Sequence, residues 1–301
     1  MTGPTVAVLT LAHGRHQHLT AQVDALSQSH RTPDLYLVAA IDDPDIADVV
    51  KRAASPAAPA HQVRVVPVHA RSRGLPLARS RNAAAAAAIE AETDLLVFLD
   101  VDCLPSSQLV GRYAETAATV RQGDSGGMRP TVLAGTVHYL PPRRPGQERY
   151  TTTDLHATGA HPARPAPAPD QVWAADDPLL FWSLSFAITA QDWLTLGGFD
   201  EDYVGYGGED TDFAMRLTAH DGQLLWVGGA SCYHQHHDVE DPPLGHLADI
   251  VTNSNRFHAR WGFFPMGGWL SAFAAHGLIR QTGSPPRWHL TEAGHRAVRT
   301  S

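Results

Sequence analysis

The alternation of strand and helix patterns over the first 120 residues is the feature that most limits how this chain can fold. Apolar stretches rich in Val, Ile and Leu predict four strands, at 5–11, 35–41, 63–68 and 95–99. The stretches that follow these strands predict four helices, near 15–28, 45–54, 77–91 and 106–121. Strands that alternate with helices are typical of βαβ units with a parallel sheet. We therefore expect an α/β fold in which helices flank a mostly parallel, Rossmann-like central sheet.

Two acidic pairs stand where predicted strands end, and parallel sheets bind ligands beyond those carboxyl ends. Asp42 and Asp43 follow the second strand, and Asp100-Val101-Asp102 follows the fourth. Residues two apart in an extended chain face the same way, so Asp100 and Asp102 can share one ligand. Carboxylate oxygens suit Mg²⁺ or Mn²⁺, which also bind phosphate. An isolated Asp-x-Asp also occurs at solvated strand ends, so the metal-site interpretation depends on the rest of the chain.

A glycine-rich stretch carries a second acidic signature, 209–212 (Glu-Asp-Thr-Asp), after Gly205, Gly207 and Gly208. Glycine adopts backbone conformations that other residues avoid, and we expect a helix to begin here. Acidic residues favour helix N-termini, which is the simpler interpretation. Asp212 fits it, because Arg216 lies four residues further on and can pair with it.

Asp210 fits that simpler interpretation less well. Phe213 and Leu217 lie three and seven residues after it, on the same helical face. This spacing turns Asp210 toward the interior, where partial burial raises the pKa of a carboxyl group toward that of a useful general base. We therefore expect Asp210 to be catalytic.

Three histidines lie close together after a predicted strand at 224–227: His234, His236 and His237. In an extended chain His234 and His236 share a face, and His237 lies opposite. A neutral imidazole is a good third ligand for Mn²⁺. A polar surface loop is the alternative, and which histidine joins a metal site stays open. Cys103 and Cys232 adjoin the proposed metal elements, but thiolates suit hard cations poorly, so we interpret both as small buried residues.

The sequence predicts that the chain has three parts. Residues 1–120 and 121–240 would be the two halves of one domain, and 241–301 would be a helical extension. The segment 141–170 contains seven prolines and predicts a long loop, which we expect to become ordered on substrate binding. Further helices are predicted at 244–260 and after Gly262.

Composition excludes several functional classes. The 301 residues are 43% hydrophobic and carry a net charge of −8, so a large core is expected and a broad nucleic-acid surface is not. Two cysteines argue against a disulfide scaffold. No signal peptide is evident, and no apolar run reaches the roughly 18 residues of a membrane span. We expect a cytoplasmic protein, with peripheral membrane contact left open.

The residues at 197–201 (Gly-Gly-Phe-Asp-Glu) and 205–212 (Gly-Tyr-Gly-Gly-Glu-Asp-Thr-Asp) resemble a known pattern. The chain resembles GT-A fold glycosyltransferases close to family 2 over roughly 5–240. Its C-terminal half is similar to the galactosyltransferase-type domain of β-1,4-galactosyltransferases and bacterial chondroitin-type polymerases. Asp100-Val101-Asp102 matches the family's Asp-x-Asp (DxD) motif, 77–82 its Ala-Arg-Asn helix start, and 233–235 its late metal-binding histidine.

The resemblance implies roles for these residues. Asp210 would be the catalytic base, with Glu209 bonded to substrate beside it, and Asp100, Asp102 and His234 would form the metal site. The nucleotide-sugar site would comprise Asp42, Asp43, Arg79, Arg81, Asn82, Asp100, Gly207 and Gly208. The chain departs from the family after the second strand, where 42–45 (Asp-Asp-Pro-Asp) replaces an Asp-Gly-Ser/Thr signature. This departure leaves open which nucleotide the donor carries.

These features together predict an inverting glycosyltransferase. It would move a sugar from a nucleotide-diphosphate sugar, with a UDP-sugar as the expected donor, to an acceptor hydroxyl. The acceptor would be a glycan, a glycolipid or a small molecule, and Mn²⁺ or Mg²⁺ would be the cofactor. A nucleotidyltransferase acting on sugar phosphates is an alternative, but it normally has a glycine-rich and basic loop after the first strand, where this chain has 12–16 (Ala-His-Gly-Arg-His). A non-catalytic sugar-binding module is another, although it needs no interior carboxylate at Asp210.

Overall fold

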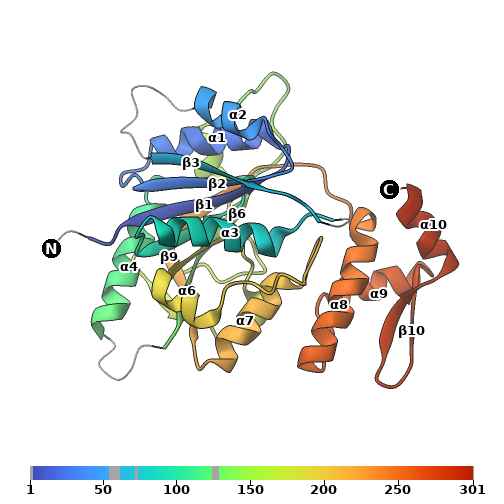
Figure 1. Cartoon of the computed structure of the whole chain (residues 1–301). Helices are drawn as coiled ribbons and strands as arrows, with labels where there is room; N and C mark the ends of the chain where they lie inside the picture. The colour runs from blue at the N-terminus through green and yellow to red at the C-terminus, as the bar shows by residue number, and fades with distance from the viewer. Residues whose placement is uncertain (1–2, 54–61, 72–73, 124–128, 301) are drawn as a thin grey trace. The chain divides into compact units, whose positions relative to one another are not determined.

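The computed structural model describes residues 3–53, 62–71, 74–123 and 129–300. The chain divides into two compact units. The first comprises 1–69, 80–198 and 214–236, and the second comprises 70–79, 199–213 and 237–301. Figure 1 gives the order of the elements along the chain.

The first unit contains a nine-stranded sheet in the order β3-β2-β1-β4-β8-β6-β9-β5, with β7 also paired to β9. Its first half consists of β1 (Val6–Ala12), β2 (Leu35–Ile41), β3 (Gln62–Val68) and β4 (Leu95–Leu99), all parallel. Every residue of β1, β2 and β4 is buried, and all of them except Thr10 of β1 are apolar, whereas the edge strand β3 is partly exposed. The four predicted strands are confirmed.

The second half of the sheet mixes strand directions. β8 (Ser185–Thr189) is antiparallel to β4 and to β6 (Thr131–Tyr139), and β6 is parallel to β9 (Gln223–His234). Two short strands, β5 (Cys103–Pro105) and β7 (Val172–Ala174), are antiparallel to β9. Since β6 and β9 share the direction of β1–β4, the sheet is mostly parallel, as expected. β5, β6 and β7 were not predicted from the sequence, and β9 is longer than the strand predicted at 224–227.

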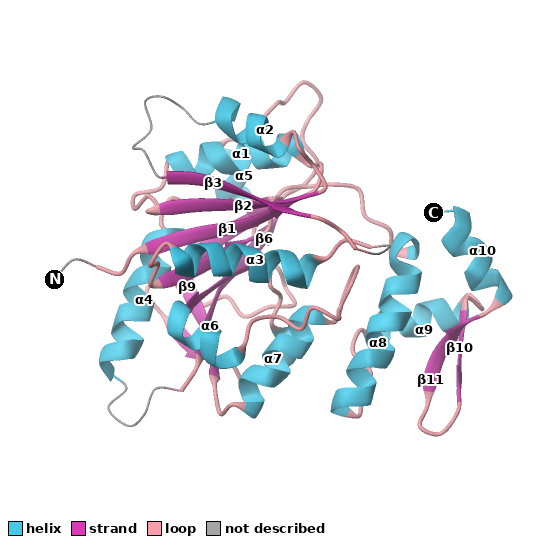
Figure 2. Cartoon of the chain, in the orientation of Figure 1, coloured by secondary structure: helices cyan, strands magenta, loops and turns pink. Residues whose placement is uncertain are grey.

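Helices cover the sheet of the first unit (Figure 2). α1 (His16–Ser27), α2 (Ile46–Ala53) and α4 (Leu109–Gly123) bury apolar side chains in one core with β1, β2 and β4. In α1 these are Leu19, Val23 and Leu26, whose helical spacing predicted the helix. Further helices are α3 (Leu77–Glu90), α6 (Ala190–Leu196) and α7 (Glu209–Ala219). All four helices predicted in the first 120 residues are confirmed.

The C-terminal part of the second unit has its own core. α8 (Leu247–Trp261) and α9 (Gly267–Ala275) pack with the hairpin of β10 (Ile279–Thr282) and β11 (Arg287–Leu290), and α10 (Glu292–Thr300) ends the chain. The helix predicted at 244–260 is confirmed, with its first turn a 3₁₀ helix at Leu244–His246. The hairpin was not predicted. In the described part of the chain, every helix is too short or too polar to cross a membrane.

The proline-rich segment 141–170 is mostly irregular, as expected, but includes one short helix, α5 (Thr152–Ala157). Thr151 caps this helix. Its hydroxyl accepts a hydrogen bond from the Asp154 N–H, and the Asp154 carboxylate accepts one from the Thr151 N–H. The capping box is why a proline-rich segment still forms a helix here.

The α5 cap should respond to acid. The N–H and then the hydroxyl of Thr151, with help from Gln147, lower the pKa of Asp154 to about 2. An unfolded Asp has a pKa of about 3.9, so this carboxylate stabilises the folded state above about pH 4, and the contribution is lost as the pH falls toward 2. The Thr151 amide signal in NMR should titrate with a midpoint near 2, and Asp154→Asn should remove the titration. A midpoint near 4 would contradict the capping box.

Candidate functional site

Two candidate metal ligands approach each other where the chain turns from β4 into β5. The Cys103 N–H donates to the Asp100 carbonyl over 2.9 Å, so the chain turns at Asp100-Val101-Asp102 and then pairs with β9. In that pairing Cys103 lies opposite His234, and the Gln235 N–H donates to the Asp102 carbonyl over 2.7 Å. These bonds bring Asp102 Oδ2 within 3.6 Å of His234 Nε2, with side chains 16% and 17% exposed. The structure thus brings together two residues 132 positions apart that the sequence analysis assigned to one metal.

Asp100 lies beside a buried guanidinium. Arg81 Nη2, on α3, donates to Asp100 Oδ1 over 3.1 Å. Arg81 therefore supplies positive charge next to the acidic turn. Asn82, the next residue of α3, packs against the backbone of Gly198: a Cβ at Gly198 would lie 2.6 Å from Asn82 Oδ1.

Gln22 is a supporting residue that the sequence analysis missed. Its side chain is fully buried, and its amide nitrogen donates to the carbonyls of Asp100 and Cys103 over 2.7 and 2.8 Å. Its amide oxygen accepts bonds from Thr10 and Tyr36. Gln22 thereby fixes both ends of the acidic turn. A polar residue on the apolar face of α1, beside Leu19, Val23 and Leu26, was the available signal.

The two aspartates after β2 have different surroundings. Asp43 Oδ2 accepts hydrogen bonds of 2.8 Å from the Gly14 N–H and from His16 Nε2, so it holds the loop between β1 and α1. Burial acts to raise the pKa of Asp43, but bonds from His16, Gly14 and Asp45 outweigh it and lower this pKa. Asp42 is more exposed, contacts His69 and has a left-handed backbone at φ 43°. Of the two, Asp42 is better placed to reach a ligand.

Glycines shape the turn before α7 in the second unit. Gly205 has φ 76°, and its N–H donates to the Leu75 carbonyl over 3.0 Å. A Cβ at Gly205 would overlap the carboxylate of Asp249, which accepts the Tyr206 N–H. Gly207 and Gly208 both have φ 91°, a conformation that other residues rarely adopt. This turn positions Glu209 and Asp210 at the first turn of α7.

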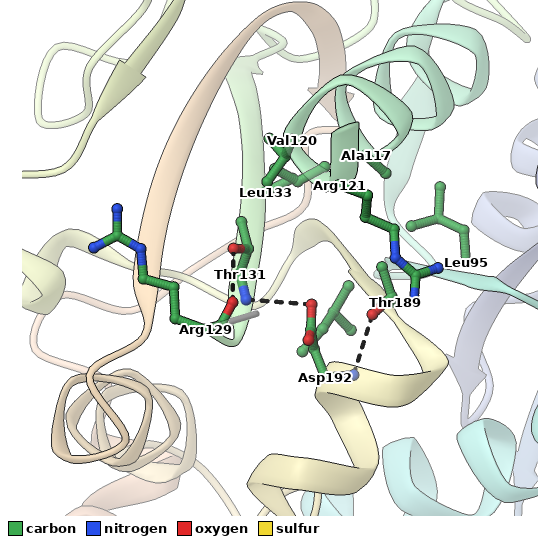
Figure 3. A pocket seen from close by; sticks show the side chains of 10 residues that line it. Leu95, Ala117, Val120, Arg121, Arg129, Thr131, Leu133, Thr189 and Asp192 are labelled. Carbon is green, nitrogen blue, oxygen red and sulfur yellow. Dashed lines mark hydrogen bonds between the residues drawn. The ribbon is translucent and has the colours of Figure 1, made fainter. Parts of the chain in front are cut away.

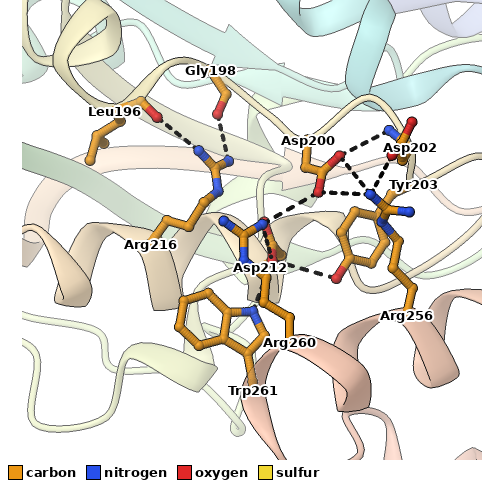
Figure 4. Close-up of polar contacts among 10 residues, drawn as sticks. All are labelled: Leu196, Gly198, Asp200, Asp202, Tyr203, Asp212, Arg216, Arg256, Arg260 and Trp261. Atoms are coloured by element: carbon orange, nitrogen blue, oxygen red, sulfur yellow. Dashed lines mark hydrogen bonds and ion pairs between the residues drawn. The ribbon is translucent and has the colours of Figure 1, made fainter.

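In α7 the most buried carboxylate is not that of Asp210, the residue whose helical face was predicted to turn toward the interior. Glu209 is buried and Asp210 is half-buried, and Asp210 Oδ1 accepts the Thr211 N–H over 2.7 Å. Asp212 is 0% exposed. Trp261 Nε1 and Arg260 Nη1 donate to Asp212 over 2.8 and 3.2 Å (Figure 4). The simple interpretation of Asp212 as a helix-start residue paired with Arg216 did not anticipate this burial, because the donors come from α8.

Arg216 and Arg256 complete the contacts in Figure 4. Within the first unit, Arg216 donates to the carbonyls of Leu196 and Gly198, where the Gly-Gly turn follows α6. Within the second unit, Arg256 pairs with Asp200 and Asp202. The motif at 197–201 is therefore fixed to its surroundings by arginines.

Replacing Asp212 by Asn should destabilise the protein. The change removes the charge that accepts hydrogen bonds from Arg260 and Trp261, so we expect the free energy of unfolding to fall by about 1–3 kcal/mol. Urea denaturation followed by tryptophan fluorescence measures this. Asp202→Asn is the matched control, since Asp202 is an exposed partner of Arg256 and should lose at most about 1 kcal/mol. Equal losses in both variants would contradict the assigned role of Asp212.

The remaining predicted site residues are distributed over both units. Arg79 is half-buried in the second unit, and His236 is exposed, its N–H donating to Tyr150 Oη over 3.3 Å. His237 is in the second unit, and its Nδ1 lies 3.1 Å from the Asp238 carbonyl. Cys103 and Cys232 are buried and reduced, as expected. The predicted metal ligands Asp102 and His234 belong to the first unit, and Glu209 and Asp210 belong to the second.

Two hollows lie apart from these residues. One, of about 20 Å³, is lined by Arg121, Arg129, Thr131 and Asp192, and Asp192 accepts the Thr131 N–H there (Figure 3). This volume holds about one water molecule, so the hollow does not accommodate a nucleotide. The other is an open groove of about 510 Å³ in the second unit, lined in part by Asp200, Arg256 and Arg287.

Residues 180–238 match the family described as the N-terminal domain of galactosyltransferase. This span includes β8, α6, α7 and β9, and therefore Asp210 and His234. Two curated relatives are validoxylamine A glucosyltransferases of Streptomyces hygroscopicus. The one from subspecies limoneus is 26% identical over 72% of this chain and 48% of its own length. The one from subspecies jinggangensis is 29% identical over 53% of this chain and 39% of its own length. The chain thus spans less than half of either relative.

Solved glycosyltransferase structures share the fold. GalNAc-T7 with UDP, GalNAc and Mn²⁺ superposes with a TM-score of 0.52 and 17% identity, over 86% of this chain and 50% of that one. The mannosyltransferase PcManGT of Pyrobaculum calidifontis, with GDP-Man and Mn²⁺, has a TM-score of 0.52 and 15% identity, over 92% and 76%. The chain therefore has the GT-A fold of these glycosyltransferases, and its residues 180–238 are similar to a galactosyltransferase-type domain, as its motifs implied.

Proposed function

We propose that this protein transfers a sugar from a nucleotide-diphosphate sugar to an acceptor hydroxyl, with a divalent metal and inversion at the anomeric carbon. The observation that carries the proposal is the approach of Asp102 to His234 beside Asp100 and Arg81. This constellation offers hard oxygen and imidazole ligands next to a cation, at the carboxyl end of a parallel strand. The matched segment at 180–238 adds Asp210 as a candidate base.

The donor atoms of Asp102 and His234 fit a single ion. Two ligands each about 2.1 Å from an ion such as Mg²⁺ can be separated by up to about 4.2 Å, so the 3.6 Å separation requires little movement. Oxygen and imidazole nitrogen together suit Mn²⁺ or Mg²⁺. A metal bound here would neutralise charge on the leaving diphosphate. The sequence leaves open whether His236 or His237 joins them. His236 is exposed and its described bond is made by its backbone, which disfavours it as a ligand, and Mn²⁺ binding to His236→Ala and His237→Ala tests the choice.

Asp210 is the proposed base and Glu209 the proposed substrate ligand. Half-burial at the first turn of α7 suits a carboxylate that accepts the proton of the acceptor hydroxyl as it attacks the anomeric carbon. A base on the acceptor side corresponds to in-line displacement, and hence to inversion. Asp212 is excluded from this role by its full burial and its bonds to Arg260 and Trp261.

A uridine nucleotide is the proposed donor, with Asp42 as the proposed ligand of the nucleoside. UDP occupies the structures of GalNAc-T7 and of TarS from S. aureus, which share the fold. PcManGT binds GDP-Man on the same fold, so residues of this chain, above all Asp42, must determine the base preference. The loop after β1 is an unsuitable phosphate loop because Asp43 already accepts the Gly14 N–H. This contact disfavours a nucleotidyltransferase.

Thermal shift with nucleotides tests the proposal. We expect UDP with Mn²⁺ to raise the melting temperature more than GDP, dTDP or CDP, and UDP with EDTA to have little effect. Release of UDP from UDP-sugars in the presence of candidate acceptors then identifies the sugar. If no nucleoside diphosphate stabilises the protein with or without metal, the proposed reaction is wrong.

A further inference from the structure

Arg164, in the proline-rich segment, is a buried cation with no described acceptor. Its side chain is 6% exposed. Nε, Nη1 and Nη2 are all inaccessible to solvent, and no described residue accepts a hydrogen bond from any of them. Only its backbone is bonded, through an N–H that donates to the His161 carbonyl over 3.2 Å. Since a guanidinium is always charged and presents five N–H donors, this position is costly in the protein alone.

Two tryptophans contact the guanidinium. Its central carbon lies 5.2 Å from the ring centre of Trp182 and 5.0 Å from that of Trp226. Such contacts attract a cation, but aromatic rings do not accept the in-plane N–H bonds of its edge. Burial lowers the pKa of Arg164, and the neighbours that oppose this effect are the thiols and phenols of Cys232, Tyr113, Tyr139 and Cys103. No carboxylate is among these neighbours, and within the described ranges no residue accepts a hydrogen bond from the guanidinium.

A row of rings connects Arg164 to the proposed metal site within the first unit. Tyr139 stacks on His234 with ring centres 4.6 Å apart, and His161 lies 4.6 Å from Tyr139. Trp182 then lies 5.1 Å from His161 and contacts Arg164. Tyr139 is exposed, and His161 and Trp182 are partly so. The exposed part of this row, above all Tyr139, is open to a sugar that extends away from the proposed metal site.

We propose that Arg164 binds a carboxylate or phosphate group of a substrate that lies along this row, after a movement of the 141–170 segment that exposes the guanidinium nitrogens, which are inaccessible in the ligand-free protein. The proposal rests on the function proposed above. A carboxylate or phosphate can accept two parallel N–H bonds from the guanidinium edge, which supplies both hydrogen-bond acceptors and a counterion. The anion comes either from the acceptor or from the diphosphate of the donor. In either case Arg164 selects a charged substrate over a neutral one.

Inorganic phosphate is the first probe. Titration of ¹⁵N-labelled protein should shift the indole N–H signals of Trp182 and Trp226, and Arg164→Gln should weaken phosphate binding by at least about tenfold, since paired charge-assisted bonds are lost. Arg144→Gln is the matched control, because Arg144 lies in the same segment but is exposed and paired with Asp154. Equal phosphate affinity in wild type and Arg164→Gln would overturn the proposal, as would an equal loss in Arg144→Gln.

Competition with nucleotide separates the two sources of the anion. If phosphate still binds to protein saturated with UDP and Mn²⁺, the site serves the acceptor. If UDP displaces phosphate, and Arg164→Gln weakens UDP but not uridine, the site serves the donor diphosphate. The phosphate titration needs no nucleotide, so failure of UDP to bind the wild type would count against the proposed function and not against this site.

Stability provides an independent readout. Arg164→Met keeps a long side chain against the two tryptophans but removes the unpaired charge. If the residue is retained for a ligand, this variant should melt at a higher temperature than the ligand-free wild type while losing phosphate binding. A lower melting temperature together with unchanged phosphate binding would show a purely structural role, and Arg164→Lys, which keeps the charge, should then restore stability.

Discussion

Replacing Asp210 by Asn should lower the rate of sugar transfer by roughly 10²–10⁴-fold, the usual cost of losing a general base. The variant keeps the size of the side chain and an oxygen that can accept the Thr211 N–H. The helix start and the affinity for the nucleotide should therefore be unchanged. Steady-state transfer rates together with calorimetry of UDP binding measure the two effects separately.

Asp212→Asn and Glu209→Gln are the comparisons that make the Asp210 result specific. Asp212→Asn should transfer sugar at close to the wild-type rate at temperatures where it is folded, because its contacts are to Arg260 and Trp261. Glu209→Gln should lose activity through substrate binding, with a raised KM. An Asp210→Asn variant with the wild-type rate, beside an inactive but folded Asp212→Asn, would reverse the proposed roles. Donor hydrolysis to UDP is an alternative assay, although water need not require the same base.

Local patterns in the sequence were sufficient to predict the first half of the sheet. β1, β2 and β4 are buried on both faces, so nearly all their residues are apolar, with Thr10 as the exception. Such apolar runs between helices predict parallel strands. β6 was missed although it is longer than any of them. Its sequence contains Gly135 and Thr136, and its ladder with β9 is irregular between Gly135 and Val137, so it has no clear period.

The candidate site likewise depends on contacts between segments that lie far apart in the sequence. Asp102 and His234 were assigned to one metal through a family resemblance, and the β5–β9 pairing is what brings them together. That pairing involves three residues of β5, too few for a periodic signal. The burial of Asp212 depends on donors from α8, some 48 residues away, and the spacing within α7 contains no trace of them. Arg164 was missed because arginines in proline-rich segments are usually solvated.

Replacing Asp102 or His234 by Ala should abolish the metal-dependent part of nucleotide binding. Loss of an outer partner of a metal ligand already costs about 10–100-fold in metal affinity, so loss of a ligand should cost at least about 100-fold. In these variants the affinity for UDP should be the same in Mn²⁺ as in EDTA. The residual affinity in EDTA, which depends on the nucleoside contacts, should be the same as in the wild type.

His236→Ala is the matched control for the metal site, since His236 is exposed two residues from His234 and its described bond is made by the backbone. It should retain the Mn²⁺ dependence of UDP binding. Calorimetry of Mn²⁺ alone and of UDP with Mn²⁺ gives both affinities for each variant. Because Asp102 and His234 would ligate one ion, the double variant should bind UDP no more weakly than the poorer single variant. Losses that add fully in the double variant, or a Mn²⁺ effect that survives in Asp102→Ala, would show that the two residues do not share a metal.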